Sequence, residues 1–128
     1  MLFRSNTIVR FHFYRGTTVI GDVDVEMFDQ DKPVTVSNFL SYVRSGAYQN
    51  LLLNRCRPGF VIQAGGLWTP SPLSSAVFEA GLTADHGPIT NEFDVGPRLS
   101  NTFGTIAMAR AVGEVSLPDR GTNSASSQ

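Results

Sequence analysis

One segment of the chain, the run from Asn54 to Gly66, holds the residue types that could do chemistry. It contains Arg55, the aromatic Phe60 and the amide Gln63, and Pro58-Gly59 breaks it with a turn signal. Side chains alternate between the faces of a strand, so two adjoining strands can gather the arginine fork, the ring and the amide around one shallow patch. Fixed donors beside an apolar floor suit a peptide carbonyl next to a proline ring.

The same segment offers no activated nucleophile, carboxylate pair or metal-ligand set, so hydrolysis and group transfer have no candidate residues. Cys56 is the single cysteine, and with His12 and His86 it gives no zinc-ligand spacing. We interpret Cys56 as a half-buried strand residue rather than a reactive thiol. The acidic residues between Asp22 and Asp31 alternate along a strand, which indicates a solvated face rather than a calcium site.

Elements that could position this segment follow from hydrophobic periodicity. Thr7–Tyr14 and Thr18–Phe28 alternate apolar and polar residues, which predicts an antiparallel hairpin with one wet face. Between Pro33 and Gly46 the apolar residues recur at three- and four-residue spacings, which predicts a helix of about three turns. Its apolar face holds the residues Val36, Phe39, Leu40 and Val43.

The remaining chain predicts short strands and long loops. Leu51–Ala64 is β-rich and interrupted at Pro58-Gly59, and Gly65–Pro88 has the Gly, Pro, Ser and Thr content of a long surface loop. Gly104–Ala109 is short, apolar and glycine-led, which predicts a buried strand. One helix among several strands predicts a mainly β domain, either a barrel or an α+β sheet.

Length and composition limit the function classes. The 128 residues make about one domain, and 41% of them are apolar, enough for one core. Ten basic against eleven acidic residues leave a net charge of −1, so neither nucleic acid nor an anionic membrane is an expected partner. Residues 1–6 contain no apolar leader. We therefore expect a cytoplasmic protein, or an exported one whose leader has been removed.

Six blocks of sequence span nearly the whole chain, namely Pro33–Phe39, Gly46–Tyr48, Arg55–Gly66, Ile89–Glu92, Gly104–Arg110 and Asn123–Gln128. In content and order they resemble the cyclophilin family, and the bacterial cyclophilins in particular. Asn54, just before the third block, replaces a usual histidine. Within that block Ala64 replaces a usual glycine, and Val61 shortens the wall that a methionine commonly forms.

The resemblance implies a peptidyl-prolyl cis-trans isomerase on an eight-stranded antiparallel β-barrel capped by two helices. It implies that Arg55 is the catalytic residue, with no cofactor and no metal. Proline-containing polypeptides would be the substrates, and a cyclosporin-type compound is a possible ligand. The resemblance assigns substrate binding to Phe60, Val61, Gln63, Met108, Ala109, Arg110 and Gln128.

By this comparison the 128 residues form a single domain that covers the N-terminal three-quarters of the family's fold. We expect an incomplete barrel with one capping helix, without the closing strands and the second helix. Two hypotheses about function remain open. The chain is either an isomerase acting on X-Pro bonds during protein folding, or a catalytically impaired fragment or non-catalytic module that binds proline peptides.

Overall fold

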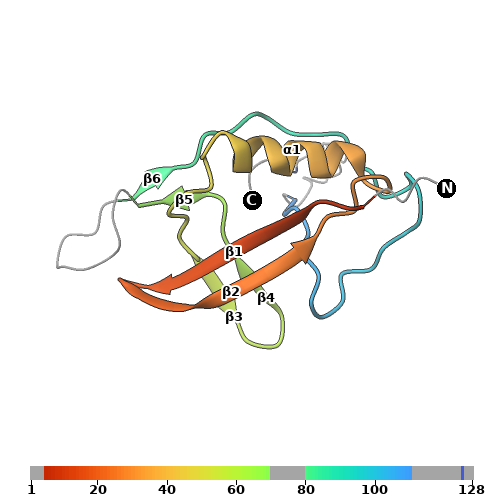
Figure 1. Ribbon diagram of the computed structural model, residues 1–128. Coiled ribbons are helices and arrows are strands. Elements are labelled where there is room, and N and C mark those ends of the chain that lie inside the picture. Colours follow the sequence, from red (N-terminus) through yellow and green to blue (C-terminus); the bar gives the residue numbers. More distant parts are fainter. Residues whose placement is uncertain (1–4, 70–79, 111–124, 126–128) are drawn as a thin grey trace, which may run out of the picture.

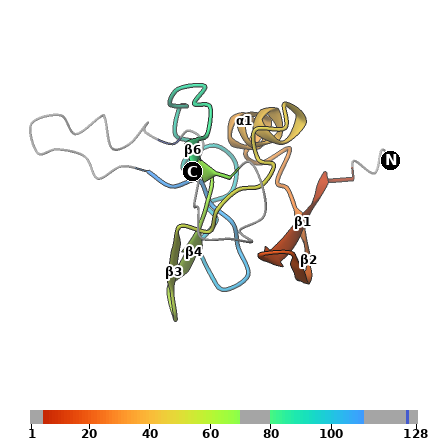
Figure 2. The same cartoon turned by 90° about the vertical axis from the view of Figure 1, so that its left-hand side faces the viewer.

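The computed structural model describes residues 5–69, 80–110 and 125. Its strands are β1 (Ile8–Arg15), β2 (Thr18–Glu26), β3 (Arg55–Arg57), β4 (Val61–Gln63), β5 (Leu67–Trp68) and β6 (Gly81–Leu82), and its helix is α1 (Pro33–Arg44). The strands pair as three two-stranded antiparallel sheets, β1–β2, β3–β4 and β5–β6. Figure 1 shows α1 above the β1–β2 and β3–β4 hairpins, with β5 and β6 to its left, and Figure 2 shows the two hairpins separated from each other below α1.

This arrangement confirms a mainly β fold with a capping helix and an incomplete barrel. Within the described residues the three sheets are not joined into one closed sheet. No helix among those residues has the length and apolar character needed to cross a membrane.

The first hairpin forms as its alternation predicts. Val9, Phe11 and Val25 lie on the half-buried face, and the opposite face carries exposed cross-strand pairs. Arg10 donates to Asp24 at 2.7 Å, and His12 Nδ1 lies 2.7 Å from Asp22. The acidic side chains of β2 therefore belong to a solvated face, and no group of acidic, His or Cys side chains in the described residues could hold a metal ion.

Helix α1 covers the half-buried face of this hairpin. Met27, Val36, Phe39 and Leu40 form the core cluster, each at most 7% exposed, and Val9, Phe11, Val25, Tyr48 and Met108 pack against it. The helix ends in a Schellman motif, with Ala47 N–H bonded to Tyr42 O and Gly46 N–H to Val43 O, and Gly46 takes the positive φ of 77° that this motif requires.

The predicted buried face of α1 is wrong at its last turn. Val43 is 37% exposed, and the fully enclosed side chain there is Tyr42. The reason is lateral packing, because Tyr48 and His86 stack on the Tyr42 ring at centroid distances of 5.1 and 4.1 Å. These two rings enclose the Tyr42 side chain.

Two predictions about the second half of the chain are also wrong. Gly104–Ala109 forms no strand, and Ile106 is 49% exposed, because no described segment pairs with this stretch to complete a backbone ladder. The stretch Gly65–Pro88 is not wholly a loop, since it holds β5 and β6. The indole N–H of Trp68 also joins these two strands by donating to Leu82 O at 3.2 Å.

Candidate functional site

The β3–β4 hairpin builds the candidate site from local sequence. Phe60 N–H bonds to Arg57 O at 3.1 Å and closes a four-residue turn with Pro58 and Gly59 at its centre. Proline presets the φ of the second position, and Gly59 supplies the positive φ of 71° at the third, as in a type II turn. This turn fixes the register that pairs Arg55 with Gln63 and Arg57 with Val61.

The register brings the arginine, the amide and the ring together on one face. Arg55 Nη1 donates to Gln63 Oε1 at 3.4 Å, a long hydrogen bond between cross-strand partners. Arg55 Cζ also lies 5.7 Å from the centroid of the Phe60 ring, within cation–π range. Phe60 belongs to the turn and not to β4, whereas the predicted β-rich stretch resumes directly after Pro58-Gly59. The Phe60 ring is turned towards the arginine.

This face is open. Phe60 is 71% exposed, and Arg55 is exposed as well, whereas Val61 and Gln63 are half-buried. A guanidinium has five N–H donors, and the bond to Gln63 uses one of them. The face can therefore accept a flat apolar ring on Phe60 and offer N–H donors to an adjacent carbonyl or nitrogen.

The other predicted substrate-binding residues lie outside the β3–β4 hairpin in the sequence. Met108 is half-buried and packs against the core cluster, Ala109 is half-buried, and Arg110 is exposed; all three lie on the segment that follows Gly104. Gln128 lies outside the described residues. The structure thus gathers Arg55, Phe60, Val61 and Gln63 on one hairpin.

Cys56 corrects a prediction, because it is exposed and not half-buried. It alternates with the two arginines and so lies on the opposite face of β3, paired with Ile62, which is itself 55% exposed. No described element packs over this face, and so a side chain expected to be partly enclosed lies at the surface.

Arg57 was not among the predicted site residues. It lies two positions from Arg55 on the same face of β3, and its Cζ is 5.9 Å from the centroid of the Phe60 ring. The alternation of the strand was the signal that could have found it, since Arg55 and Arg57 have the same parity.

A buried carboxylate at the start of α1 was also missed. Glu92 is 6% exposed, and its Oε1 and Oε2 accept the N–H groups of Val34 and Thr35 at 3.0 and 2.7 Å. Burial alone would raise the pKa of Glu92, but these amide donors and the Lys32 charge outweigh it and hold the pKa below its usual range. Glu92 thus caps a helix whose own N-cap, Lys32, makes no side-chain capping bond.

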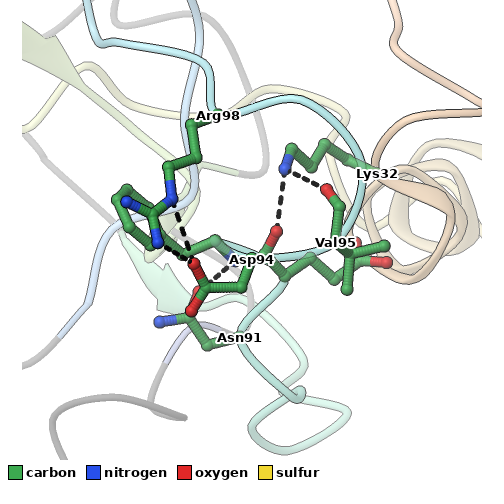
Figure 3. Close-up of polar contacts among 7 residues, drawn as sticks. Lys32, Asn91, Asp94, Val95 and Arg98 are labelled. Atoms are coloured by element: carbon green, nitrogen blue, oxygen red, sulfur yellow. Dashed lines mark hydrogen bonds and ion pairs between the residues drawn. The ribbon is translucent and has the colours of Figure 1, made fainter.

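Lys32 completes the attachment from the other side. Its Nζ donates to the backbone oxygens of Glu92 and Val95 at 2.8 and 2.5 Å (Figure 3). In the same loop Arg98 pairs with Asp94, and the Asn91 side chain accepts Phe93 N–H. We call Lys32 and Glu92 together the helix clamp, because they fasten the loop at 89–98 to the first turn of α1.

Comparisons with known proteins show the family to which the sequence is similar. Residues 13–128 match the family model of the cyclophilin type peptidyl-prolyl cis-trans isomerases. Peptidyl-prolyl cis-trans isomerase B of Escherichia coli is 42% identical over 105 residues, which are 80% of this chain and 53% of that protein. Isomerase A of Dickeya dadantii is 40% identical over 94 residues, 73% of this chain and 44% of that protein.

A peptidyl-prolyl cis-trans isomerase of Acinetobacter baylyi is 35% identical over 121 residues, 93% of this chain and 53% of that protein. The chain therefore spans about half the length of the curated relatives it matches.

Proposed function

Because the chain belongs to the cyclophilin-type peptidyl-prolyl cis-trans isomerase family, we propose that it catalyses rotation about X-Pro peptide bonds in unfolded or flexible polypeptides. The observation that carries the proposal is the contact of the Arg55 guanidinium with both the Gln63 amide and the Phe60 ring on one open face. The guanidinium carbon lies 5.7 Å from the ring centroid, so N–H donors and an apolar surface lie side by side there.

The chemical problem is rotation about the peptide bond. Its partial double-bond character sets a rotation barrier of about 18–20 kcal/mol. In the twisted state the amide has lost its resonance, and the prolyl nitrogen has gained a lone pair that can accept a hydrogen bond. A guanidinium donor beside that nitrogen binds the twisted state better than either planar one, and this differential binding lowers the barrier.

The other residues of the proposal have supporting roles. The Phe60 ring is the floor for the proline, Val61 forms its wall, and Gln63 holds the peptide backbone. Met108, Ala109, Arg110 and Gln128 contact the residues around the proline in this proposal. Rotation breaks no covalent bond and moves no electron between molecules, so it needs no cofactor. A cyclosporin-type compound, which is rich in apolar surface, is proposed as a competing ligand.

Replacing Arg55 tests the proposal. In a protease-coupled assay on a proline tetrapeptide, Arg55→Ala should lower kcat/KM by about 100-fold, the usual loss when a donor to the transition state is removed. The control is Arg15→Ala, an exposed arginine at the end of β1 on the other hairpin. The proposal fails if the chain gives no rate above the uncatalysed one, or if both variants keep the rate of the unmodified chain.

The same open face supports a second candidate, a module that binds proline peptides without catalysing their rotation. At 71% exposure the Phe60 ring is reached by water, and hydrogen-bond donors contribute less in water than in an enclosed site. Measurable binding of a proline peptide, with no acceleration of its isomerisation, would identify this module in place of the enzyme.

A further inference from the structure

The proposed mechanism uses Arg55 and leaves a second cation on the same face unassigned. Arg57 follows Arg55 on β3, and both guanidinium carbons lie within 6 Å of the Phe60 centroid, at 5.7 and 5.9 Å. One ring therefore stands beside two positive charges. A cation–π contact of this kind orients an arginine and leaves its N–H edge free for a ligand.

Among the described residues, no carboxylate forms an ion pair with Arg55 or Arg57. The ion pairs there involve Arg10, His12 and Arg98. Both arginines are exposed. The chain carries a net charge of −1, so this pair of cations is a local concentration of positive charge on a chain that is not basic overall.

From this geometry we infer that Arg57 determines specificity, favouring peptide substrates with a carboxylate side chain within two residues of the proline. Alternate residues of a strand are about 7 Å apart, which is also the reach of two residues in an extended peptide. A peptide with its prolyl bond at Arg55 therefore presents a neighbouring side chain at Arg57. A guanidinium fork binds a carboxylate through two parallel hydrogen bonds and repels an ammonium group. The inference rests on the proposed function.

The test compares matched tetrapeptides that carry Glu, Gln or Lys either just before the proline or two positions before it. For the unmodified chain, kcat/KM should be highest with Glu and lowest with Lys, by about two- to fivefold, as expected of an exposed ion pair. Arg57→Met, which keeps much of the side-chain volume, should bring the Glu-to-Lys ratio close to one, with the rate on the Gln peptide as the reference to which both rates are scaled. Arg57→Lys should retain most of the preference, and 0.5 M salt should reduce it.

The matched control is Arg15→Met, which removes the same charge from the other hairpin and should leave the ratio unchanged. An unchanged ratio in Arg57→Met overturns the inference, and so does an equal loss in Arg15→Met, which would mean that only net charge matters. If no peptide is isomerised, the proposed function fails. In that case the inference is tested by measuring the affinities of the same Glu and Lys peptides by calorimetry, and equal affinities would refute it.

Discussion

At the residue scale, replacing Phe60 should affect isomerase activity far more than the stability of the fold. Its side chain is 71% exposed and touches the two arginines, so it buries little area that could stabilise the fold. We expect Phe60→Ala to change the free energy of unfolding by less than about 0.5 kcal/mol. The same change should lower kcat/KM on proline peptides by about tenfold, since it removes the apolar floor. Urea unfolding and the isomerase assay measure the two effects.

Phe39 is the control for Phe60. It is 7% exposed in the core cluster, and Phe39→Ala should cost about 3–5 kcal/mol of stability. If Phe60→Ala destabilises the chain by a comparable amount, the ring belongs to the core and not to an open site.

The residues of the hairpin face could be predicted from sequence because strand alternation and one Pro-Gly turn determine which side chains lie together. Arg55 and Gln63 meet as expected for this reason. The exposure of side chains was harder to predict, because the burial of a strand face depends on which distant segment covers it. For this reason the prediction that Cys56 is half-buried was wrong. Glu92 was missed because its partners Val34 and Thr35 precede it by more than fifty positions in the chain.

At the element scale, α1 depends on a carboxylate from another segment. The first turn of the helix contains no acidic residue, and its N-cap makes no side-chain bond, so Glu92 alone satisfies two of the free N–H groups there. Lys32 holds the loop that carries Glu92 through its backbone oxygens. The helix clamp therefore links the stability of α1 to the position of the loop at 89–98.

This link predicts a dependence of stability on pH. The pKa of Glu92 is lower in the folded chain than in the unfolded one, where it is about 4.3. Its contribution is present above that value and is lost as the pH falls through the folded pKa. Glu92→Gln should lower the free energy of unfolding by about 1 kcal/mol at pH 7 and by less at pH 3, because pH 3 lies below the unfolded pKa and the carboxylate's contribution is being lost there.

Urea midpoints at the two pH values measure this difference. Asp94→Asn is the control, because Asp94 lies in the same loop and forms an ion pair with Arg98. The side chains of both partners are exposed at the surface. An exposed pair contributes little, so that variant should match the unmodified chain at pH 7. A Glu92→Gln effect of equal size at both pH values would contradict the capping role of the carboxylate.

Elements were predicted well where their signals are local. Helix α1 and the β1–β2 hairpin follow from periodicity, a first-turn proline and a turn glycine, all within a few residues of one another. The predicted strand at Gly104–Ala109 failed because a strand needs a partner for its backbone groups, and its own residues do not specify that partner. The two-residue strands β5 and β6 are too short to show a period.

At the scale of the whole molecule, the described core is small and much apolar surface stays in contact with water. The core cluster has four members, whereas large apolar side chains on several elements are more than 60% exposed. These are Val19, Ile20, Phe60, Leu82 and Phe103. Exposed apolar side chains next to unpaired strand edges favour self-association.

Phe103 gives this property a test, because its ring is fully exposed at 107% of the reference area and so buries nothing in the folded chain. We expect Phe103→Ser to reduce concentration-dependent self-association in sedimentation velocity and to weaken binding of the apolar dye ANS.

The free energy of unfolding in urea should stay within about 0.5 kcal/mol of that of the unmodified chain, since Phe103→Ser loses no packing. The control is Thr105→Ser, which keeps the hydroxyl that donates to Thr102 O at 2.7 Å and removes only a methyl group. If both variants associate like the unmodified chain, the exposed ring does not contribute to association. If instead Phe103→Ser lowers the urea midpoint substantially, the ring is packed in solution, and the exposed apolar surface of the molecule is smaller than the structure indicates.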